Sequence, residues 1–292
     1  MKNKFEFSIL GNPNSGKTAI FNLLTGLNQK VSNYPGITVE KKSSNIRVNN
    51  KDIILNDYPG SYSIKSQSID ESVVRNAVVS WMSNEDSRPD GIIYVADITN
   101  LRRNLYFFSQ LLPLDIPIIV LLNMSDIVNP NQIVDIDKLK KNFNVFDIIP
   151  FSASKKHGLK NLKITLGRFV ETNLTQPINN SLKLSSSNKN LLKPLFDIIN
   201  NHLKLSKKII EDLSLSIFSS ESFCNKLFFN DSVKAQLLKE RNRILSAIDN
   251  DMLQNIRTLE SDLRYGFIDD VLYKSDYKKI KKVKLQSKSE KI

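Results

Sequence analysis

The chain of 292 residues has little of several things that would define its class. Cys224 is its only cysteine, which excludes a disulfide-stabilised fold. It has only 9 glycines and 10 prolines, which excludes collagen-like and low-complexity chains. Its longest strongly apolar run, from Ile116 to Leu122, contains Pro117 and is far shorter than the roughly 20 residues that span a bilayer. The first ten residues also lack the apolar core of a signal peptide, so the default expectation is a cytoplasmic protein.

What the chain does have is an average share of apolar residues and an excess of basic ones. Hydrophobic residues make up 40% and charged residues 25%, as in soluble globular proteins, so disorder over the whole length is excluded. The 42 basic and 30 acidic side chains give a net charge of +12, and half of this excess lies in residues 274–292. Such a basic tail suits a nucleic acid or an anionic membrane surface, or is simply solvated, and composition does not separate these alternatives.

Residues 1–170 alternate between short apolar runs and segments with helical periodicity. The alternation predicts an α/β domain whose mostly parallel sheet is covered by helices on both faces. The predicted strands are Phe5–Leu10, Ile53–Asn56, Gly91–Ala96, Pro117–Leu122 and Val145–Ile149. The predicted helices include Ala19–Thr25, Ile69–Met82, Arg102–Leu112 and Ile136–Phe143.

From residue 171 the pattern changes. Residues 171–190 are rich in Asn, Ser and Thr, which predicts a linker. The helical patterns that follow have no strand alternation, so we expect a small all-helical domain over residues 178–273 and then the basic tail at 274–292. Its helices are expected at Leu191–Leu203, Lys207–Phe218, Asp231–Asp249 and Met252–Tyr273.

The letters GNPNSGKT, from Gly11 to Thr18, fit the pattern G-x4-G-K-[ST] of a phosphate-binding loop and follow a predicted strand. Glycines allow such a loop to wrap closely, so that its backbone N–H groups point at the phosphates. Lys17 can then bind the β and γ phosphates, and the Thr18 hydroxyl can ligate Mg2+. The helix that follows presents its N-terminus to the same phosphates.

Two segments downstream predict a response to the γ-phosphate. The letters DYPG begin at Asp57, where a carboxylate can hold Mg2+ and the Gly60 N–H can bond the γ-phosphate. Thr38 lies between the two motifs, among Gly and Pro residues typical of a loop. A threonine there can contact Mg2+ and the γ-phosphate only in the triphosphate state, which makes its loop a switch. The alternative is a β-favouring residue that opens a strand.

The base is predicted from the ends of the last two strands. In the letters NMSD at 123–126, the Asp126 carboxylate can accept from the guanine N1–H and N2 amine, donors that adenine lacks. The letters SAS at 152–154 can offer a backbone N–H to the guanine oxygen. The residues assigned to the nucleotide are Gly11, Asn12, Pro13, Asn14, Ser15, Gly16, Lys17, Thr18, Asn123, Met124, Asp126, Ser152, Ala153 and Ser154. Those assigned to catalysis are Asn14, Lys17, Thr38 and Gly60, and those assigned to Mg2+ are Thr18, Thr38 and Asp57.

These elements in this order resemble the small GTPase superfamily, that is, a Ras-like P-loop GTPase fold. Finer lettering is more specific: GNPNSGKT, NYPGITVEKK at 33–42, DYPGSYS at 57–63, NMSD, and RYGFID at 264–269. Together they resemble the cytosolic part of the bacterial ferrous iron transporter B family, FeoB. In that family a GTPase domain and a helical domain precede a membrane domain that moves Fe2+. The resemblance is close over the α/β domain and weak over the helical domain, except at RYGFID.

The resemblance also implies how hydrolysis is assisted. A Ras-like GTPase usually has Gln after DxxG to orient the attacking water, but here that residue is Ser61, and no arginine finger is evident. Slow intrinsic hydrolysis is therefore expected unless another positive charge is supplied. In the resembled family K+ supplies it, and the matching ligands are Asn14 and the carbonyls of Ser32 and Tyr34. Physically, K+ would neutralise developing charge as an arginine does. The alternative for Asn14 is a loop residue that bonds its own backbone.

The favoured function is thus a GTP-binding and GTP-hydrolysing switch with GTP or GDP, Mg2+ and K+ as cofactors. Its implied partner is a membrane iron-permease domain, in the same chain or a separate subunit, and its place is then the cytoplasmic face of the inner membrane. The alternative is a ribosome or RNA-maturation GTPase, which the basic tail favours and the neutral helical domain does not. RNA is therefore the less favoured partner, and DNA is not expected. A non-enzymatic scaffold would not need Lys17, Thr18, Thr38 and Asp57 together.

Overall fold

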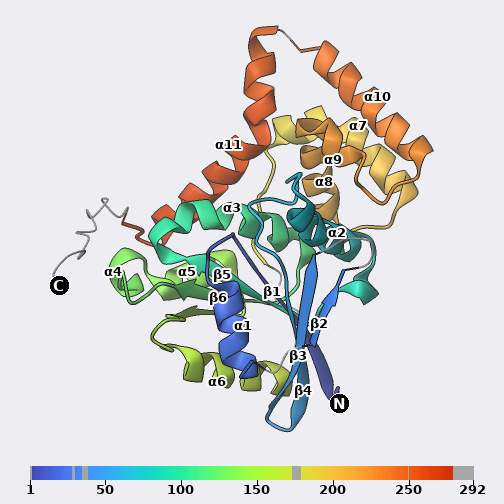
Figure 1. Ribbon diagram of the computed structural model, residues 1–292. Helices are drawn as coiled ribbons and strands as arrows, with labels where there is room; N and C mark the ends of the chain where they lie inside the picture. The colour runs from blue at the N-terminus through green and yellow to red at the C-terminus, as the bar shows by residue number, and fades with distance from the viewer. Residues whose placement is uncertain (1, 28–29, 35–38, 173–178, 249, 279–292) are drawn as a thin grey trace, which may run out of the picture.

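The computed structural model describes residues 2–27, 30–34, 39–172, 179–248 and 250–278 (Figure 1). A seven-stranded sheet lies at its centre in the order β2-β3-β4-β1-β5-β6-β7. The strands are β1 Lys4–Gly11, β2 Lys30–Asn33, β3 Glu40–Val48, β4 Lys51–Asp57, β5 Gly91–Asp97, β6 Ile118–Asn123 and β7 Asp147–Pro150. Strands β4, β1, β5, β6 and β7 run parallel, whereas β3 is antiparallel to both of its neighbours. The predicted α/β class with a mostly parallel sheet is confirmed.

Strands β2 and β3 were not among the five predicted. Both lie at an edge of the sheet, where β2 is exposed along its whole length and only Ser44 of β3 is buried. The letters of β3, EKKSSNIRV, have neither the apolar run of a central strand nor a clear alternation. Backbone pairing with β4, from Lys42 opposite Asp57 to Val48 opposite Lys51, holds β3 in place instead.

Helices cover both faces of the sheet, as the alternating pattern predicts. One face packs against α1 and α6, which share a core with the sheet through side chains such as Phe21 and Leu166. The other face packs against α2, α3 and α5, through Val78, Phe108 and Leu139 among others. The helices of this α/β region are α1 Lys17–Thr25, α2 Ile69–Ser83, α3 Leu101–Leu111, α4 Pro130–Ile133, α5 Ile136–Phe143 and α6 Leu159–Glu171.

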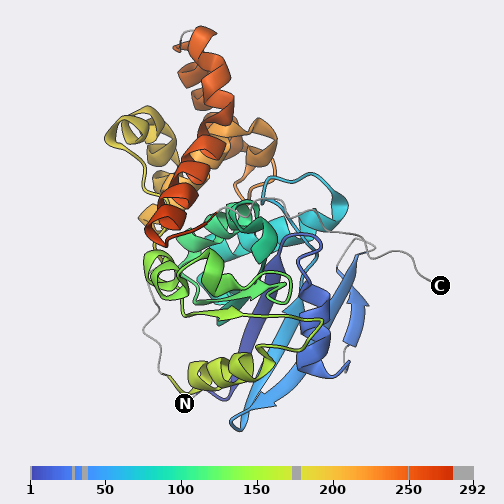
Figure 2. The same cartoon turned by 90° about the vertical axis from the view of Figure 1, so that its left-hand side faces the viewer.

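The helical region, residues 186–274, stands on the α2 and α3 side of the sheet (Figures 1 and 2). Its helices are α7 Ser186–His202, α8 Lys207–Ser219, α9 Glu221–Cys224, α10 Asp231–Ser246 and α11 Asn250–Lys274. Its buried side chains, such as Leu195, Leu213 and Ile268, belong to the same hydrophobic cluster as those of α2, α3 and α5. The two regions therefore share one continuous core, and α11 crosses both α3 and α5.

Two helix ends in the helical region differ from expectation. Helix α7 begins at Ser186, within the predicted linker, because Ser185 caps it by accepting from the Asn188 N–H. Helix α10 ends at Ser246 rather than Asp249, and residue 249 lies outside the described residues. Cys224 lies in the short helix α9 and is fully buried, as a small hydrophobic side chain would be.

The start of the basic tail packs against the protein, and Tyr277 contacts the core. Polar contacts also hold it: Ser275 is fully buried, its carbonyl accepts from Asp135 N–H at 2.9 Å, and its hydroxyl accepts from Asn142. The N–H of Lys278 donates to Ile133 O at 2.7 Å. Residues 279–292 lie outside the described residues. Within the described ranges, no helix combines the length and the apolar character needed to cross a membrane.

Candidate nucleotide site

The predicted phosphate loop connects the end of β1 to the start of α1. Gly16, the residue before the helix, has φ 95°, and a side chain there would clash with the Asn123 amide. No side chain caps the N-terminus of α1, so its first N–H groups can donate to an anion. Two buried atoms of the loop, Asn12 Nδ2 and Ser15 Oγ, have no hydrogen-bond partner among the described residues. The loop thus carries several donors that the protein itself does not use.

Lys17 is buried at the mouth of this loop, with 6% of its surface exposed. Its ammonium donates to Asn12 O at 2.8 Å. Burial lowers the pKa of Lys17 to about 8, and the nearby Asp57 charge only partly opposes the shift. A doubly charged phosphate beside the ammonium would favour its charged form again.

Asp57 and Thr18 meet at the edge of the loop. The Thr18 hydroxyl donates to Asp57 Oδ2 at 3.0 Å, while Asp57 Oδ1 is buried without a partner in the described part of the chain. Burial raises the pKa of Asp57, and the Thr18 hydrogen bond and the Lys17 charge oppose that rise. Hydroxyl and carboxylate oxygens are the ligands that Mg2+ prefers, so this pair fits the metal that the sequence predicts.

The DYPG segment lies directly against the phosphate loop. The Tyr58 N–H donates to Ile9 O and the Ser61 N–H to Gly11 O, both at 3.2 Å. A side chain on Gly60 would come within 2.6 Å of Pro13 Cα, so only glycine allows this approach. Gly60 therefore lies beside Pro13 and Lys17, where its N–H can meet a phosphate.

The two segments predicted to read the base also come together. Asn123 is buried between them: its amide donates to Ser15 O at 2.8 Å and its oxygen accepts from Ala153 N–H at 3.0 Å. Asn123 therefore ties the phosphate loop to the SAS segment through both ends of its side chain. Asp126 is exposed, and Ser154 donates to its Oδ2 at 3.0 Å. Hydrogen bonding by Ser152 and then by Ser154 lowers the pKa of Asp126 and keeps it a carboxylate.

Part of the predicted switch lies outside the described residues, and Thr38 is in that part. Asn14, the predicted K+ ligand, has φ 62° and an exposed side chain at the turn of the phosphate loop. Ser32 lies in β2 opposite Lys41, and the Tyr34 N–H donates to Val39 O at 2.9 Å. A K+ site made by Asn14, Ser32 and Tyr34 stays a prediction.

The sequence leaves two interpretations of Glu71 open: a contact with the segment after DYPG, or a solvated acid at the N-terminus of a helix. The structure shows the contact. Its carboxylate accepts from Tyr62 N–H at 3.0 Å and from the hydroxyls of Ser61 and Ser68. Burial would raise the pKa of Glu71, but hydrogen bonds from Ser66, Tyr62, Ser68 and Ser61 outweigh it and lower the pKa. The spacing of Ser68 and Glu71 is that of a capping box, which is the sequence signal for this contact.

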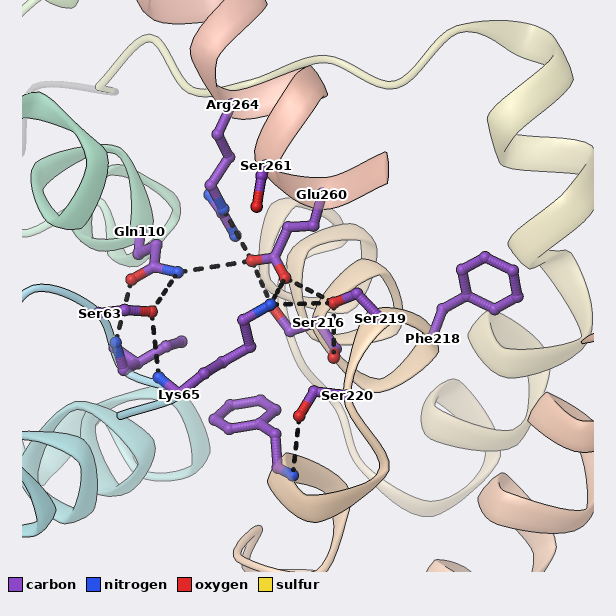
Figure 3. Close-up of polar contacts among 12 residues, drawn as sticks. Ser63, Lys65, Gln110, Ser216, Phe218, Ser219, Ser220, Glu260, Ser261 and Arg264 are labelled. Carbon is purple, nitrogen blue, oxygen red and sulfur yellow. Dashed lines mark hydrogen bonds and ion pairs between the residues drawn. The ribbon is translucent and has the colours of Figure 1, made fainter. Parts of the chain in front are cut away.

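A second buried polar cluster, which sequence reasoning missed, joins the same segment to the helical region (Figure 3). Lys65 forms an ion pair with Glu260 of α11, which also accepts from Ser219 of α8 at 2.6 Å. Arg264, fully buried, donates to Glu260 at 2.9 Å and to Asp212 of α8 at 2.7 Å. These four charges balance, and we call them the interface cluster. Two more residues of RYGFID contact α3, because Arg102 binds Asp269 through two hydrogen bonds and stacks on Tyr265.

Comparisons with known proteins agree with this geometry. A family model described as ferrous iron transport protein B matches residues 5–166. Curated proteins named Fe(2+) transporter FeoB are 38% identical to this chain, over 166 residues in Salmonella typhimurium and 167 residues in Escherichia coli K12. The matched segment is 56% and 57% of this chain but only 21% of each of these relatives.

Solved structures are similar over nearly the whole chain. A mutant of S. thermophilus NFeoB bound to mGDP is 27% identical, with a TM-score of 0.72, and the match covers 93% of this chain and 99% of that one. The cytosolic domain of L. pneumophila FeoB is 30% identical with a TM-score of 0.70, covering 92% and 98%. The likeness therefore extends through the helical region, where the sequence resemblance is weak.

Proposed function

This chain belongs to the ferrous iron transport protein B family, and we propose from that premise that it is a guanine-nucleotide switch that hydrolyses GTP. The observation that carries the proposal is the meeting of Lys17, Asp57 and Thr18 beside a loop in which two buried donors have no partner among the described residues. Solved structures of S. thermophilus NFeoB mutants bound to mGDP or GDP support the choice of nucleotide.

We assign the phosphates to the loop from Gly11 to Gly16, to Lys17 and to the N-terminus of α1. Asp126 is assigned to the guanine edge, because an exposed carboxylate held by Ser154 can accept from both guanine donors. Asn123 is assigned to positioning, since its side chain is already bonded at both ends. Mg2+ would be held by Thr18 and Asp57, and by Thr38 in the triphosphate state, and would stabilise charge on the phosphates.

Hydrolysis requires a positive charge that the described side chains do not obviously supply. Arg102 is bound to Asp269, and Arg103 stacks on the Tyr62 ring at 4.5 Å. Ser61 is too short to orient a water as a Gln does, and its single hydroxyl proton is already shared between Ser63 O at 3.0 Å and the Glu71 carboxylate at 3.2 Å. We therefore propose K+ near Asn14, Ser32 and Tyr34 as the stabilising charge.

The wider role follows from the family. Because the matched segment is 21% of the curated relatives, we propose that this chain serves a membrane part that moves Fe2+, in the same chain or in a separate subunit. It would then work at the cytoplasmic face of the membrane. The proposed division is a GTPase domain at 1–170, a linker at 171–190, a helical domain at 178–273 and a basic tail at 274–292.

The test measures GTP hydrolysis in KCl and in NaCl at equal ionic strength, with ATP as the control nucleotide. We expect hydrolysis of GTP only, with K+ raising the rate at least about tenfold. Asn14→Ala should remove the stimulation by K+, whereas Asn201→Ala, an exposed change on α7, should retain it. Equal rates in both salts would overturn the K+ site, and hydrolysis of ATP at the same rate would overturn the assigned base.

A further inference from the structure

A groove lies between α6 and the turn that joins β3 to β4, away from the phosphate loop. Its volume is about 950 Å3. Figure 1 shows α6 and this turn at the opposite end of the molecule from α7 to α11. The groove is lined by Arg47, Val48, Asn49, Lys156, Leu159, Lys160, Lys163, Ile164, Gly167, Arg168, Glu171 and Thr172. No residue of the phosphate loop, of DYPG or of NMSD takes part.

Close packing fixes the two walls of this groove. A side chain on Gly167 would come within 2.8 Å of Asn49 Nδ2, so the glycine lets the turn approach the helix. The Asn49 amide then donates to Glu171 Oε1 at 2.5 Å. Asn49 and Asn50 both have positive φ, which asparagine tolerates in a tight turn. These contacts therefore fix the β3–β4 turn against α6.

Positive charge collects in the groove without being neutralised. Arg47, Lys156, Lys160 and Lys163 make no ion pair within the described ranges, although all line the groove. Arg168 differs, because it is paired with Asp147 on the other side of α6. Among the described lining residues only Glu171 is acidic, and it accepts from Asn49, so the lining as a whole stays positively charged.

Apolar surface accompanies the charge. Ile164 is 59% exposed, and Val48 and Leu159 are half-buried in the same groove, so the three form one apolar patch. Lys163 and Ile164 lie three and four residues after Lys160, and Gly167 lies four and three residues after them, so the four residues share one face of α6. The face thus offers apolar anchoring beside unpaired cations.

We propose that this groove binds an acidic, amphipathic polypeptide segment of a partner protein. Complementary charge would come from Glu or Asp side chains, and a leucine-type side chain would cover Ile164 and Leu159. The lining argues against the two other polyanions. It comes from two elements, α6 with its flanking residues and the β3–β4 turn, so a segment that lies between them contacts more of it than a flat membrane surface does. Single-stranded RNA stacks on aromatic side chains, of which the described lining has none.

The probe is a fluorescein-labelled peptide of about 14 residues, four helical turns, with Glu and Leu on opposite faces. Binding to the full chain is followed by fluorescence anisotropy at roughly 50 mM and roughly 300 mM salt, since screening weakens surface charge pairs. The test variant is Lys160→Glu with Lys163→Glu. Lys156 is left intact because it follows the SAS segment. The matched control, Lys204→Glu with Lys207→Glu, changes charge equally on exposed sites of the helical region.

We expect saturable binding that the test variant weakens at least about tenfold and the control variant leaves unchanged. Ile164→Ser should weaken binding severalfold at unchanged charge, and a peptide with Gln in place of Glu should not bind. The test variant and the control variant should bind nucleotide as tightly as the unchanged chain, which shows that they fold. No binding, or binding that the test variant does not weaken, would overturn the proposal. Tighter binding to phosphatidylserine vesicles or to oligouridine would also overturn the proposal, if the test variant abolished that binding and the control variant did not.

Discussion

Two buried polar clusters in this protein differ in how far the protein itself satisfies them. In the interface cluster, Glu260 accepts from Lys65, Arg264, Ser219 and Ser216, so its charge is surrounded by donors. The exceptions are nearby: Asp212 Oδ2 and Ser214 Oγ have no partner among the described residues. At the phosphate loop the atoms without a described partner are ones that we assign to the nucleotide or to Mg2+, namely Asn12 Nδ2, Ser15 Oγ and Asp57 Oδ1.

Lys17 and Arg264, one buried cation from each cluster, show the same difference in their pKa values. Burial lowers the pKa of Lys17 to about 8, because a single carboxylate only partly offsets its loss of water. Burial also acts to lower the pKa of Arg264, but Asp212 and Glu260 outweigh it and raise the pKa above its ordinary value. A buried cation whose charge is neutralised by its own protein has a structural role. A buried cation with too little negative charge around it is suited to bind an anion. The predictions that follow test this contrast.

The largest effect is expected from Arg264→Met. Removing the guanidinium leaves Glu260 and Asp212 buried with fewer partners, so the free energy of unfolding should fall by about 3–5 kcal/mol. The matched control is Arg102→Met, which breaks an ion pair that is about half exposed and should cost less than about 1 kcal/mol. Denaturant unfolding measures both. Equal losses would mean that the interface cluster is not buried as the structure has it.

Lys17→Ala tests the other cluster. We expect guanine-nucleotide affinity to fall about 100-fold or more, because the ammonium makes charge-assisted bonds to phosphate. Stability without nucleotide should stay the same or rise, since a desolvated charge is removed. Lys4→Ala, an exposed change in β1, should alter neither quantity. Calorimetry and thermal unfolding of the three proteins separate the outcomes, and an unchanged affinity would refute the assignment of the phosphate loop.

The nucleotide side could be predicted from sequence because its residues are contiguous. Eight successive letters from Gly11 to Thr18 specify a loop whose backbone does most of the work, and Asp57 and Asp126 each follow a strand. Parallel strands bring those ends to one edge, so short motifs fix the site. Hydrogen bonds there join the phosphate loop to Asn123, Asn123 to the SAS segment, and Thr18 to Asp57. Thr38 lies outside the described residues, and the K+ ligands stay a prediction.

The interface cluster could not be predicted in this way. Lys65 is 195 residues from Glu260, and Asp212 is 52 from Arg264. Each of these charges, taken alone, is typical of a solvated helix or loop. The pair Glu260 and Arg264, four apart, gives the only local signal, and it is also common on exposed helices. Which charges are buried depends on how α8, α11 and the segment after DYPG pack together, and that information is not local.

Asp126→Asn sharpens the assignment of the base. The amide loses one acceptor for the guanine donors, so GTP affinity should fall about 10- to 100-fold. Its new N–H can donate to the O2 of xanthine, so xanthosine triphosphate should bind better than it does to the unchanged chain. Competition against labelled GDP measures both shifts. Asp137→Asn, a change in the first turn of α5 away from the SAS segment, is the control. Retained preference for guanine would assign its recognition to another residue.

The smallest effect expected is the pH dependence of nucleotide affinity. Lys17 has its pKa lowered to about 8 in the free protein, and bound phosphate raises it again. Affinity should therefore be constant below that pH and fall above it, by up to about tenfold per pH unit, because binding must then take up a proton. The Lys17→Arg variant keeps its positive charge throughout this range, so its nucleotide affinity should not change with pH. The titration of the guanine base affects both proteins equally. Calorimetry from about pH 7 to about pH 9 makes the comparison. If the nucleotide affinity of both proteins were independent of pH, Lys17 would be charged in the free protein over this range. The contrast between Lys17, whose charge is not neutralised, and Arg264, whose charge is, would then not hold.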